Sequence, residues 1–156
     1  MIELPAEPML ATPVETFALP SNWFAEPKWD GFRAFAARVN ELVVREETRL
    51  AFERLTQRLH RRGAAAQRAA TVWPAHYVAF DLHHLDGWSL LERPYVERRC
   101  ALKDLFRQEG LSAPWTLCPS TNDAEVARGW LTWSAAGVES CVFKDSGKSY
   151  RPGARS

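Results

Sequence analysis

The chain has 156 residues, and its composition, 46% hydrophobic and 25% charged, is that of one ordinary globular domain. The formal net charge of +1 indicates no large electrostatic field for nucleic acid, although basic clusters at 58–62 and at Arg98 and Arg99 could act locally. The three cysteines are far apart, and neither a signal peptide nor a membrane span is evident, so we expect a cytoplasmic protein with reduced thiols.

The N-terminal third of the chain is predicted to contain a lead-in, three strands and a helix. Residues 1–20 are rich in proline and predict an extended lead-in to a domain over 21–156. Two antiparallel strands, over 24–29 and 32–38, are predicted to form a hairpin about Asp30-Gly31, since glycine tolerates positive φ. A short strand is expected over 41–45.

A helix is predicted over 50–62, because leucines and a phenylalanine recur there at helical spacing. Gly63 is expected to end this helix, and residues 64–70 could continue helically after the break.

The second half of the chain predicts further strands and two helices. Strands are expected over 76–82, 115–118 and 138–144, with a turn at Asp86-Gly87. One helix is predicted over 95–109, directly after Pro94. Another begins at Thr121 or Asp123 and runs to about residue 136, before Gly137. Such a mixture favours an α+β domain over a doubly wound sheet.

Residues 26–33 read E-P-K-W-D-G-F-R and follow the form E-x-K-x-D-G-x-R. The turn would hold Lys28 at a strand end and bring Arg33 near it. A lysine has a pKa of about 10.4 and must lose its proton to act as a nucleophile, which desolvation or neighbouring cations promote. Alone, the octet also fits a surface hairpin with an exposed lysine.

Three later segments complete a pattern. Residues 77–87 read Y-V-A-F-D-L-H-H-L-D-G, where Phe80 could stack on a base or serve as a core residue. Residues 137–144 read G-V-E-S-C-V-F-K and, taken alone, fit an amphipathic strand that ends in a lysine. Glu41 precedes a short apolar run, as a glutamate can in any strand.

In this order, the segments resemble those of the ATP-dependent DNA ligases, of the bacterial actinomycete type. Residues 26–33 match the nucleophile motif, 77–87 match F-D-L-x-x-L-D-G, and 137–144 are similar to E-G-V-V-x-K. The resemblance extends from about residue 9 to the end of the chain. It implies an α+β, antiparallel-sheet nucleotidyltransferase fold, the ATP-grasp-like adenylation domain of DNA ligases.

The resemblance also implies roles for residues around the nucleotide. Lys28 would be the catalytic nucleophile that attacks the α-phosphate of ATP and carries AMP. Glu26 would contact the adenine, Phe80 would stack on it, and Arg33 would contact the ribose or a phosphate.

ATP and Mg²⁺ are the implied cofactors. Glu41 would serve the ribose or the metal, Glu139 would hold the metal, and Lys144 would contact phosphate. Oxygen ligands of this kind suit Mg²⁺. The AMP would then pass to nicked double-stranded DNA and support strand sealing in repair or recombination.

The chain departs from the family in three places. Two residues separate Arg38 from Glu41, where the family has several tens that include an R-x-x-G segment. Ser140 replaces a motif glycine, and the chain stops before a K-x-K motif and an OB-fold domain. We therefore expect a shortened, truncated adenylation domain that binds DNA weakly. The alternatives are a catalytically inactive nucleotide-binding remnant and an RNA ligase or capping-type nucleotidyltransferase.

Overall fold

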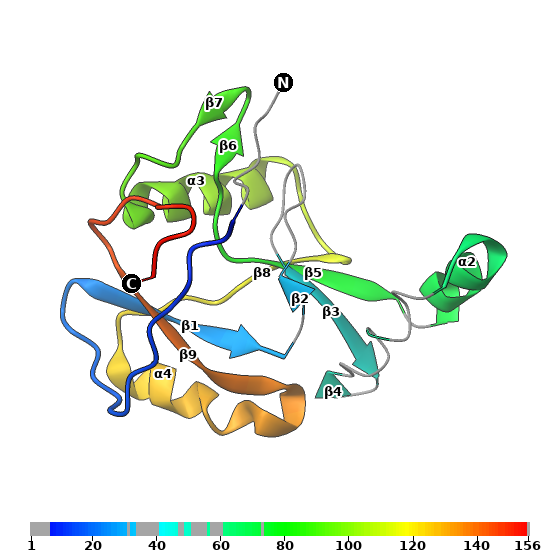
Figure 1. The fold of residues 1–156 in the computed structure, drawn as a ribbon, viewed down its shortest axis with the longest axis horizontal. Helices are drawn as coiled ribbons and strands as arrows, with labels where there is room; N and C mark the ends of the chain where they lie inside the picture. Colours follow the sequence, from blue (N-terminus) through cyan, green and yellow to red (C-terminus); the bar gives the residue numbers. More distant parts are fainter. Residues whose placement is uncertain are drawn as a thin grey trace.

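A computed structural model of the chain describes residues 7–30, 32–33, 41–46, 49–50, 56, 61–72 and 74–155; within 32–50 it describes the backbone alone. The described elements form small sheets, with two α-helices packed beside them and a third, Gly63–Val72, lying apart at one side (Figure 1). Nearly all the described strand pairs are antiparallel, as expected for the predicted α+β class. None of the helices in the described ranges has the length and apolar character needed to cross a bilayer.

The first sheet consists of β1 (Trp23–Trp29) and β9 (Val138–Asp145), which run antiparallel. Lys28 lies opposite Ser140, and the register shifts between Lys28 and Trp29. Helix α4 (Ala124–Trp130) lies along this pair in Figure 1, and Ala25, Ala127 and Trp130 form a buried cluster there. This packing places the end of β1 next to the beginning of β9.

The second sheet has the strand order β2-β3-β5-β8, with β4 paired to β3. Its strands are β2 (Phe32–Arg33), β3 (Glu41–Glu46), β4 (Arg49–Leu50), β5 (Ala75–Ala79) and β8 (Trp115–Leu117). β5 and β8 are parallel, and the crossover between them contains α3 (Tyr95–Gln108), as parallel pairing requires. Ala79, Leu82 and Leu102 form the buried cluster where α3 packs against the end of β5.

The predicted hairpin about Asp30-Gly31 is wrong. β1 pairs with β9, whereas the described part of the following strand, β2, pairs with β3. The Asp30 N–H donates to the carbonyl of Gly137, the residue before β9, at 2.9 Å, so this N–H is not used in a hairpin. The chain therefore passes from one sheet to the other at Asp30.

Helix α2 (Gly63–Val72) begins where the predicted helix was expected to end. Gly63 has a φ of 55°, the left-handed conformation that suits glycine at a break. Leu50 belongs to β4 rather than to a helix, Thr56 is helical, and most of the predicted helix over 50–62 lies outside the described residues. Residues 34–38 of the strand predicted over 32–38 also lie outside the described residues.

The turn at Asp86-Gly87 is confirmed. It joins β6 (His84–Leu85) to β7 (Trp88–Ser89), with φ of 50° at Asp86 and 85° at Gly87. Positive φ at both central residues is the type I′ arrangement that matches strand twist. The preceding strand, β5, ends at Ala79, so its predicted extension to residue 82 is wrong.

Of the two predicted caps, Thr121 and Asp123, it is Asp123 that caps α4, because its side chain accepts hydrogen bonds from the N–H groups of Glu125 and Val126. The expected continuation to residue 136 is wrong. The Thr132 hydroxyl and N–H both bind the Gly129 carbonyl, which tightens the chain, and a 3₁₀ helix, η1 (Trp133–Ala136), follows.

The described part of the lead-in packs on the domain. Its Leu10 forms a parallel bridge with Arg155 and donates an N–H to the Ala154 carbonyl at 2.8 Å. Phe17 and Leu19 pack against the buried cluster beside α4. The described lead-in and the last described residues of the chain are therefore neighbours.

Candidate functional site

Lys28 and Glu139 form an ion pair at the end of the β1–β9 sheet. The Lys28 Nζ contacts Glu139 Oε2, and each side chain is 47% exposed. Asp30 interacts electrostatically with both residues. Partial burial and then the Glu139 charge raise the pKa of Asp30, whereas the Lys28 charge lowers it. An exposed pair of this kind adds at most about 1 kcal/mol to stability. The site thus offers an accessible ammonium that contacts one carboxylate, Glu139, and interacts electrostatically with a second, Asp30.

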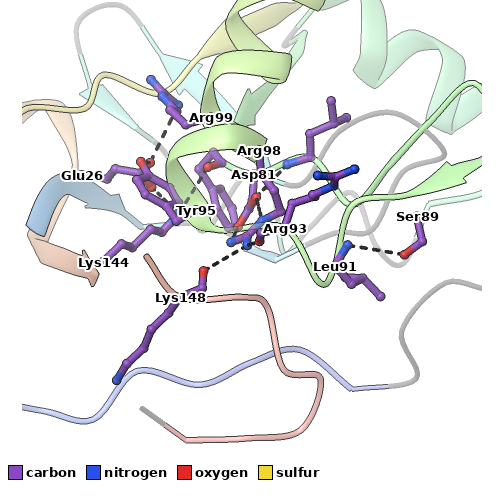
Figure 2. Close-up of polar contacts among 12 residues, drawn as sticks. Glu26, Asp81, Ser89, Leu91, Arg93, Tyr95, Arg98, Arg99, Lys144 and Lys148 are labelled. Carbon is purple, nitrogen blue, oxygen red and sulfur yellow. Dashed lines mark hydrogen bonds and ion pairs between the residues drawn. The ribbon is translucent and has the colours of Figure 1, made fainter. Parts of the chain in front are cut away.

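Further along the same strands, Glu26 is almost completely buried at 2% exposure. Figure 2 shows three side chains gathered around its carboxylate. Lys144 Nζ lies 2.6 Å from Glu26 Oε2, the Tyr95 hydroxyl donates to Oε1, and Arg99 Nη1 lies 3.7 Å from Oε1. Burial and the Glu26 charge raise the pKa of Tyr95, so its hydroxyl stays protonated as a donor.

Phe80 lies directly after β5 and borders this buried group. Its carbonyl accepts a hydrogen bond from Lys144 Nζ at 3.2 Å, and the same nitrogen lies 4.9 Å from the centroid of the Phe80 ring. Phe80 is half-buried and packs against the cluster of Val78 and Cys118. It contributes to the core and also has a ring face next to a cation.

Asp81 and Arg98 form a buried bidentate pair that the sequence analysis missed. Arg98 Nε and Nη2 donate to the two Asp81 oxygens at 2.8 and 2.9 Å. Burial alone would raise the pKa of Asp81, but the hydrogen bonds from Arg98 and the Lys144 charge hold it below its ordinary value. Arg98 also reaches the Lys148 carbonyl at 3.3 Å, which ties α3 to the residues after β9.

The suggested basic cluster at Arg98 and Arg99 is therefore wrong as a surface feature. Arg98 is 3% exposed and Arg99 is 5% exposed, and both face carboxylates inside the protein. Two consecutive arginines in the first turns of a helix, with an aspartate after a buried strand upstream, were the signal that could have identified these pairs.

The structure thus places the predicted site residues whose side chains it describes in two groups along β1 and β9. Lys28 and Glu139 are in contact at one end, whereas Glu26, Phe80 and Lys144 are in contact further along β1 and β9. The backbones of Arg33 and Glu41 lie opposite each other in the β2–β3 ladder. Their side chains fall outside the described part of the structure.

A divalent ion would find suitable donors beside Lys28. Among the residues that the structure describes, no three His, Cys, Asp or Glu side chains are placed to share a metal. Asp30 and Glu139, however, interact electrostatically, and Mg²⁺ usually takes few protein carboxylates and several waters. Two oxygen donors next to an exposed ammonium fit that requirement.

Comparison with known proteins gives a family match. Residues 39–156 match the model of the ATP dependent DNA ligase domain. DNA ligase C of Mycobacterium tuberculosis is 28% identical over 190 residues, which cover 97% of this chain and 52% of that protein. DNA ligase C2 of Mycolicibacterium smegmatis is 29% identical over 188 residues, with the same coverage of 97% and 52%. The chain spans about half the length of these relatives.

Solved structures share the fold. The ligase domain from M. tuberculosis LigD has a TM-score of 0.64 at 23% identity, over 99% of this chain and 58% of that one. A Chlorella virus DNA ligase–adenylate has a TM-score of 0.55 at 16% identity, over 98% of this chain and 64% of that one. These similarities confirm the predicted α+β adenylation-domain fold.

Proposed function

The chain belongs to the ATP-dependent DNA ligase family, and on that premise we propose that it is an adenylation domain whose Lys28 takes up AMP from ATP. The observation that carries the proposal is the arrangement along β1. Lys28 is exposed at one end of the strand, beside Glu139. Glu26, on the same strand, is buried next to Phe80 and Lys144. A nucleotide could therefore extend from Lys28 towards Phe80.

The proposed step is a phosphoryl-type substitution. Lys28 Nζ loses a proton and forms a bond to the α-phosphorus of ATP, while the bond between that phosphorus and the bridging oxygen to the β-phosphate breaks. Pyrophosphate leaves with the bond electrons, and AMP remains on Lys28 as a phosphoramidate. Asp30 and Glu139 would hold Mg²⁺, which offsets the negative charge that develops on the phosphates.

The base would be positioned at the other end of the site. The Phe80 ring offers a flat face of the kind that stacks on a base. Glu26 is held rigidly by Lys144 and Tyr95, so its oxygens have fixed positions relative to that ring. We assign Glu26 and Phe80 to adenine recognition, Arg33 to the ribose or a phosphate, and Glu41 to the ribose or the metal.

In the same proposal, the AMP passes from Lys28 to the 5′-phosphate of a DNA nick, and the 3′-hydroxyl then displaces AMP to seal the strand. Nicked duplex DNA would be the partner, in the cytoplasm, during repair or recombination. Two relatives named DNA ligase C and C2, matched over 97% of this chain, support this assignment.

The test is the intact mass of the purified chain after incubation with ATP and Mg²⁺. The wild type and a Lys103→Ala control should gain one AMP, whereas Lys28→Ala should gain none. Lys103 is exposed on α3 and so controls for the loss of a surface lysine. A folded wild type without the adduct would overturn the proposal and leave a nucleotide-binding remnant. An adduct from GTP instead of ATP would indicate a capping-type enzyme.

A further inference from the structure

A hollow of about 360 Å³ lies between the N-terminal lead-in and the last described residues. We call it the tail pocket; its lining includes Met9, Gly147, Lys148, Ser149, Arg151 and Arg155. Three of these six residues are cationic. The proposed reaction at Lys28 uses none of them.

The three cations of the tail pocket, Lys148, Arg151 and Arg155, have no ion-pair partner among the residues that the structure describes. Glu7 lies against Gly153 and the Asp145 carboxylate accepts from the Gly147 N–H, but neither is paired with these cations. By contrast, three exposed arginines in or beside α3 and α4 have carboxylate partners close in sequence. These pairs are Arg93–Glu97, Arg107–Asp104 and Arg128–Glu125.

The backbone that carries the cations is held in place. The Lys148 carbonyl accepts from the Tyr95 N–H at 2.9 Å and from Arg98, and the Tyr150 N–H donates to the Leu91 carbonyl at 2.8 Å. Figure 2 shows the Lys148 side chain pointing away from Arg98, while its carbonyl faces that residue. Cations on an anchored backbone can bind an anion without first ordering a loop.

The location of the tail pocket separates it from the triphosphate. Lys28 lies opposite Ser140, and the strand then runs through residues 141–145 for roughly 16 Å before the pocket begins. Lys144 and Phe80, on the base side of the proposed nucleotide site, lie along that path. An ATP whose phosphates lie at Lys28 cannot place them here, so an anion in the pocket comes from another molecule.

We infer that the tail pocket binds a backbone phosphate of duplex DNA, through Lys148, Arg151 and Arg155. This inference rests on the proposed function, because a nick held near Lys28 places a duplex close to the domain. The planar guanidinium groups of Arg151 and Arg155 suit phosphate oxygens, and Lys148 adds a third positive charge. The overall charge of +1 gives little general attraction, so a local group of cations matters more.

The test measures binding of a fluorescein-labelled nicked duplex to the full chain by anisotropy, over a series of salt concentrations. The pocket variant combines Lys148→Ala, Arg151→Ala and Arg155→Ala. The control variant removes the same charge elsewhere on the surface, through Lys103→Ala, Arg107→Ala and Arg128→Ala. A third variant, with Lys148→Arg, Arg151→Lys and Arg155→Lys, keeps the charge. Thermal melting checks that all three fold.

The pocket variant should bind at least tenfold more weakly, and its slope of log affinity against log salt should be smaller by roughly 1 for each phosphate that the protein no longer neutralises. The control should change affinity less than threefold, and the charge-preserving variant should restore most of the wild-type slope. Equal decreases in affinity for the pocket and control variants, or no decrease for either, would overturn the inference. So would weakened ATP binding in the pocket variant with an unchanged DNA slope.

The proposed function is judged separately, from the wild-type AMP adduct on Lys28. A wild type that lacks the adduct but shows the pocket-dependent salt slope would overturn the adenylation proposal and support the DNA site. A wild type that forms the adduct but does not bind DNA would support the adenylation proposal and overturn the DNA site.

Discussion

The Lys144 ammonium lies 2.6 Å from Glu26 Oε2 in a part of the protein where Glu26 is 2% exposed. The same nitrogen lies 4.9 Å from the ring centroids of both Phe80 and Tyr95. A buried carboxylate is tolerated only when charges and donors compensate it. Lys144 therefore helps to fix the residues that we assign to the base.

Replacing Lys144 with methionine should destabilise the protein by about 3–5 kcal/mol, because the variant leaves Glu26 buried without its closest cation. Urea unfolding followed by circular dichroism would measure this change in the free energy of unfolding. Lys103→Met, at an exposed position on α3, is the control and should stay within about 0.5 kcal/mol of the wild type. Similar effects of the two substitutions would show that Lys144 and Glu26 are not coupled.

Asp81→Asn should also destabilise the chain by about 3–5 kcal/mol, since the substitution removes the charge that compensates buried Arg98. Combining it with Arg98→Met should cost less than the sum of the two single variants, because no unpaired charge is then left inside. A double-mutant cycle from denaturant melts measures this coupling. Strictly additive effects would contradict the bidentate pair.

Glu139→Gln should have little effect on the free energy of unfolding but should slow formation of the AMP adduct. The Lys28–Glu139 pair is half exposed, so its removal should change the free energy of unfolding by less than about 1 kcal/mol. If Glu139 holds Mg²⁺ in the proposed reaction, the rate of AMP-adduct formation should fall at least tenfold. Intact-mass time courses with ATP would follow the rate. A variant that forms the adduct at the wild-type rate would exclude Glu139 from the reaction.

The stability of the protein should fall between about pH 6.5 and pH 4 because of His83. Burial and then the charge of Arg98, with smaller contributions from His84 and Lys144, lower its pKa to about 4, against the opposing charge of Asp81. In this window the unfolded chain binds a proton that the folded chain does not, so acid favours unfolding by up to roughly 3 kcal/mol.

Denaturant melts at several pH values would test this expectation. His83→Phe preserves a ring against Tyr150, which packs at a centroid distance of 4.1 Å, and should flatten the stability curve in the same window. An equal decline in the His83→Phe variant would assign the acid sensitivity to other groups. Protonation of Asp81 would not cause the same loss of stability. Its pKa is lowered in the folded protein, so the stability that it contributes is lost only below about pH 4.

Asp123→Ala should destabilise the protein by about 1 kcal/mol, because the N–H groups of Glu125 and Val126 lose their acceptor at the start of α4. The neighbouring Asn122→Ala substitution, at an exposed residue outside the helix, is the control and should have little effect. Thermal melting of the pair would show the difference as a shift of a few degrees in Tm for Asp123→Ala.

Features that depend on a few consecutive residues could be predicted from the sequence. The Asp86-Gly87 turn follows from the positive φ that these residues tolerate, and the Asp123 cap follows from a carboxylate placed before a helix. The order of the motifs about Lys28, Phe80 and Glu139 indicated the family, to which the match over residues 39–156 assigns the chain.

Features that depend on residues far apart in the chain could not be predicted from the sequence. The octet around Lys28 predicted a local hairpin, yet β1 pairs with β9 from the other end of the chain. Pro94 located the start of α3, but it gave no reason for Arg98 to be buried, because that burial depends on Asp81 lying opposite it.

The sequence by itself therefore determined the chemistry available to this protein: a candidate lysine nucleophile, carboxylates for a metal and an aromatic ring for a base, in the order of a known family. The tertiary structure decided which of these groups meet. Strand pairing and the burial of charge are non-local, since each backbone edge and each buried ion takes the partner that the whole fold supplies. That is why Lys28 meets Glu139 at the surface while Glu26 meets Lys144 in the interior.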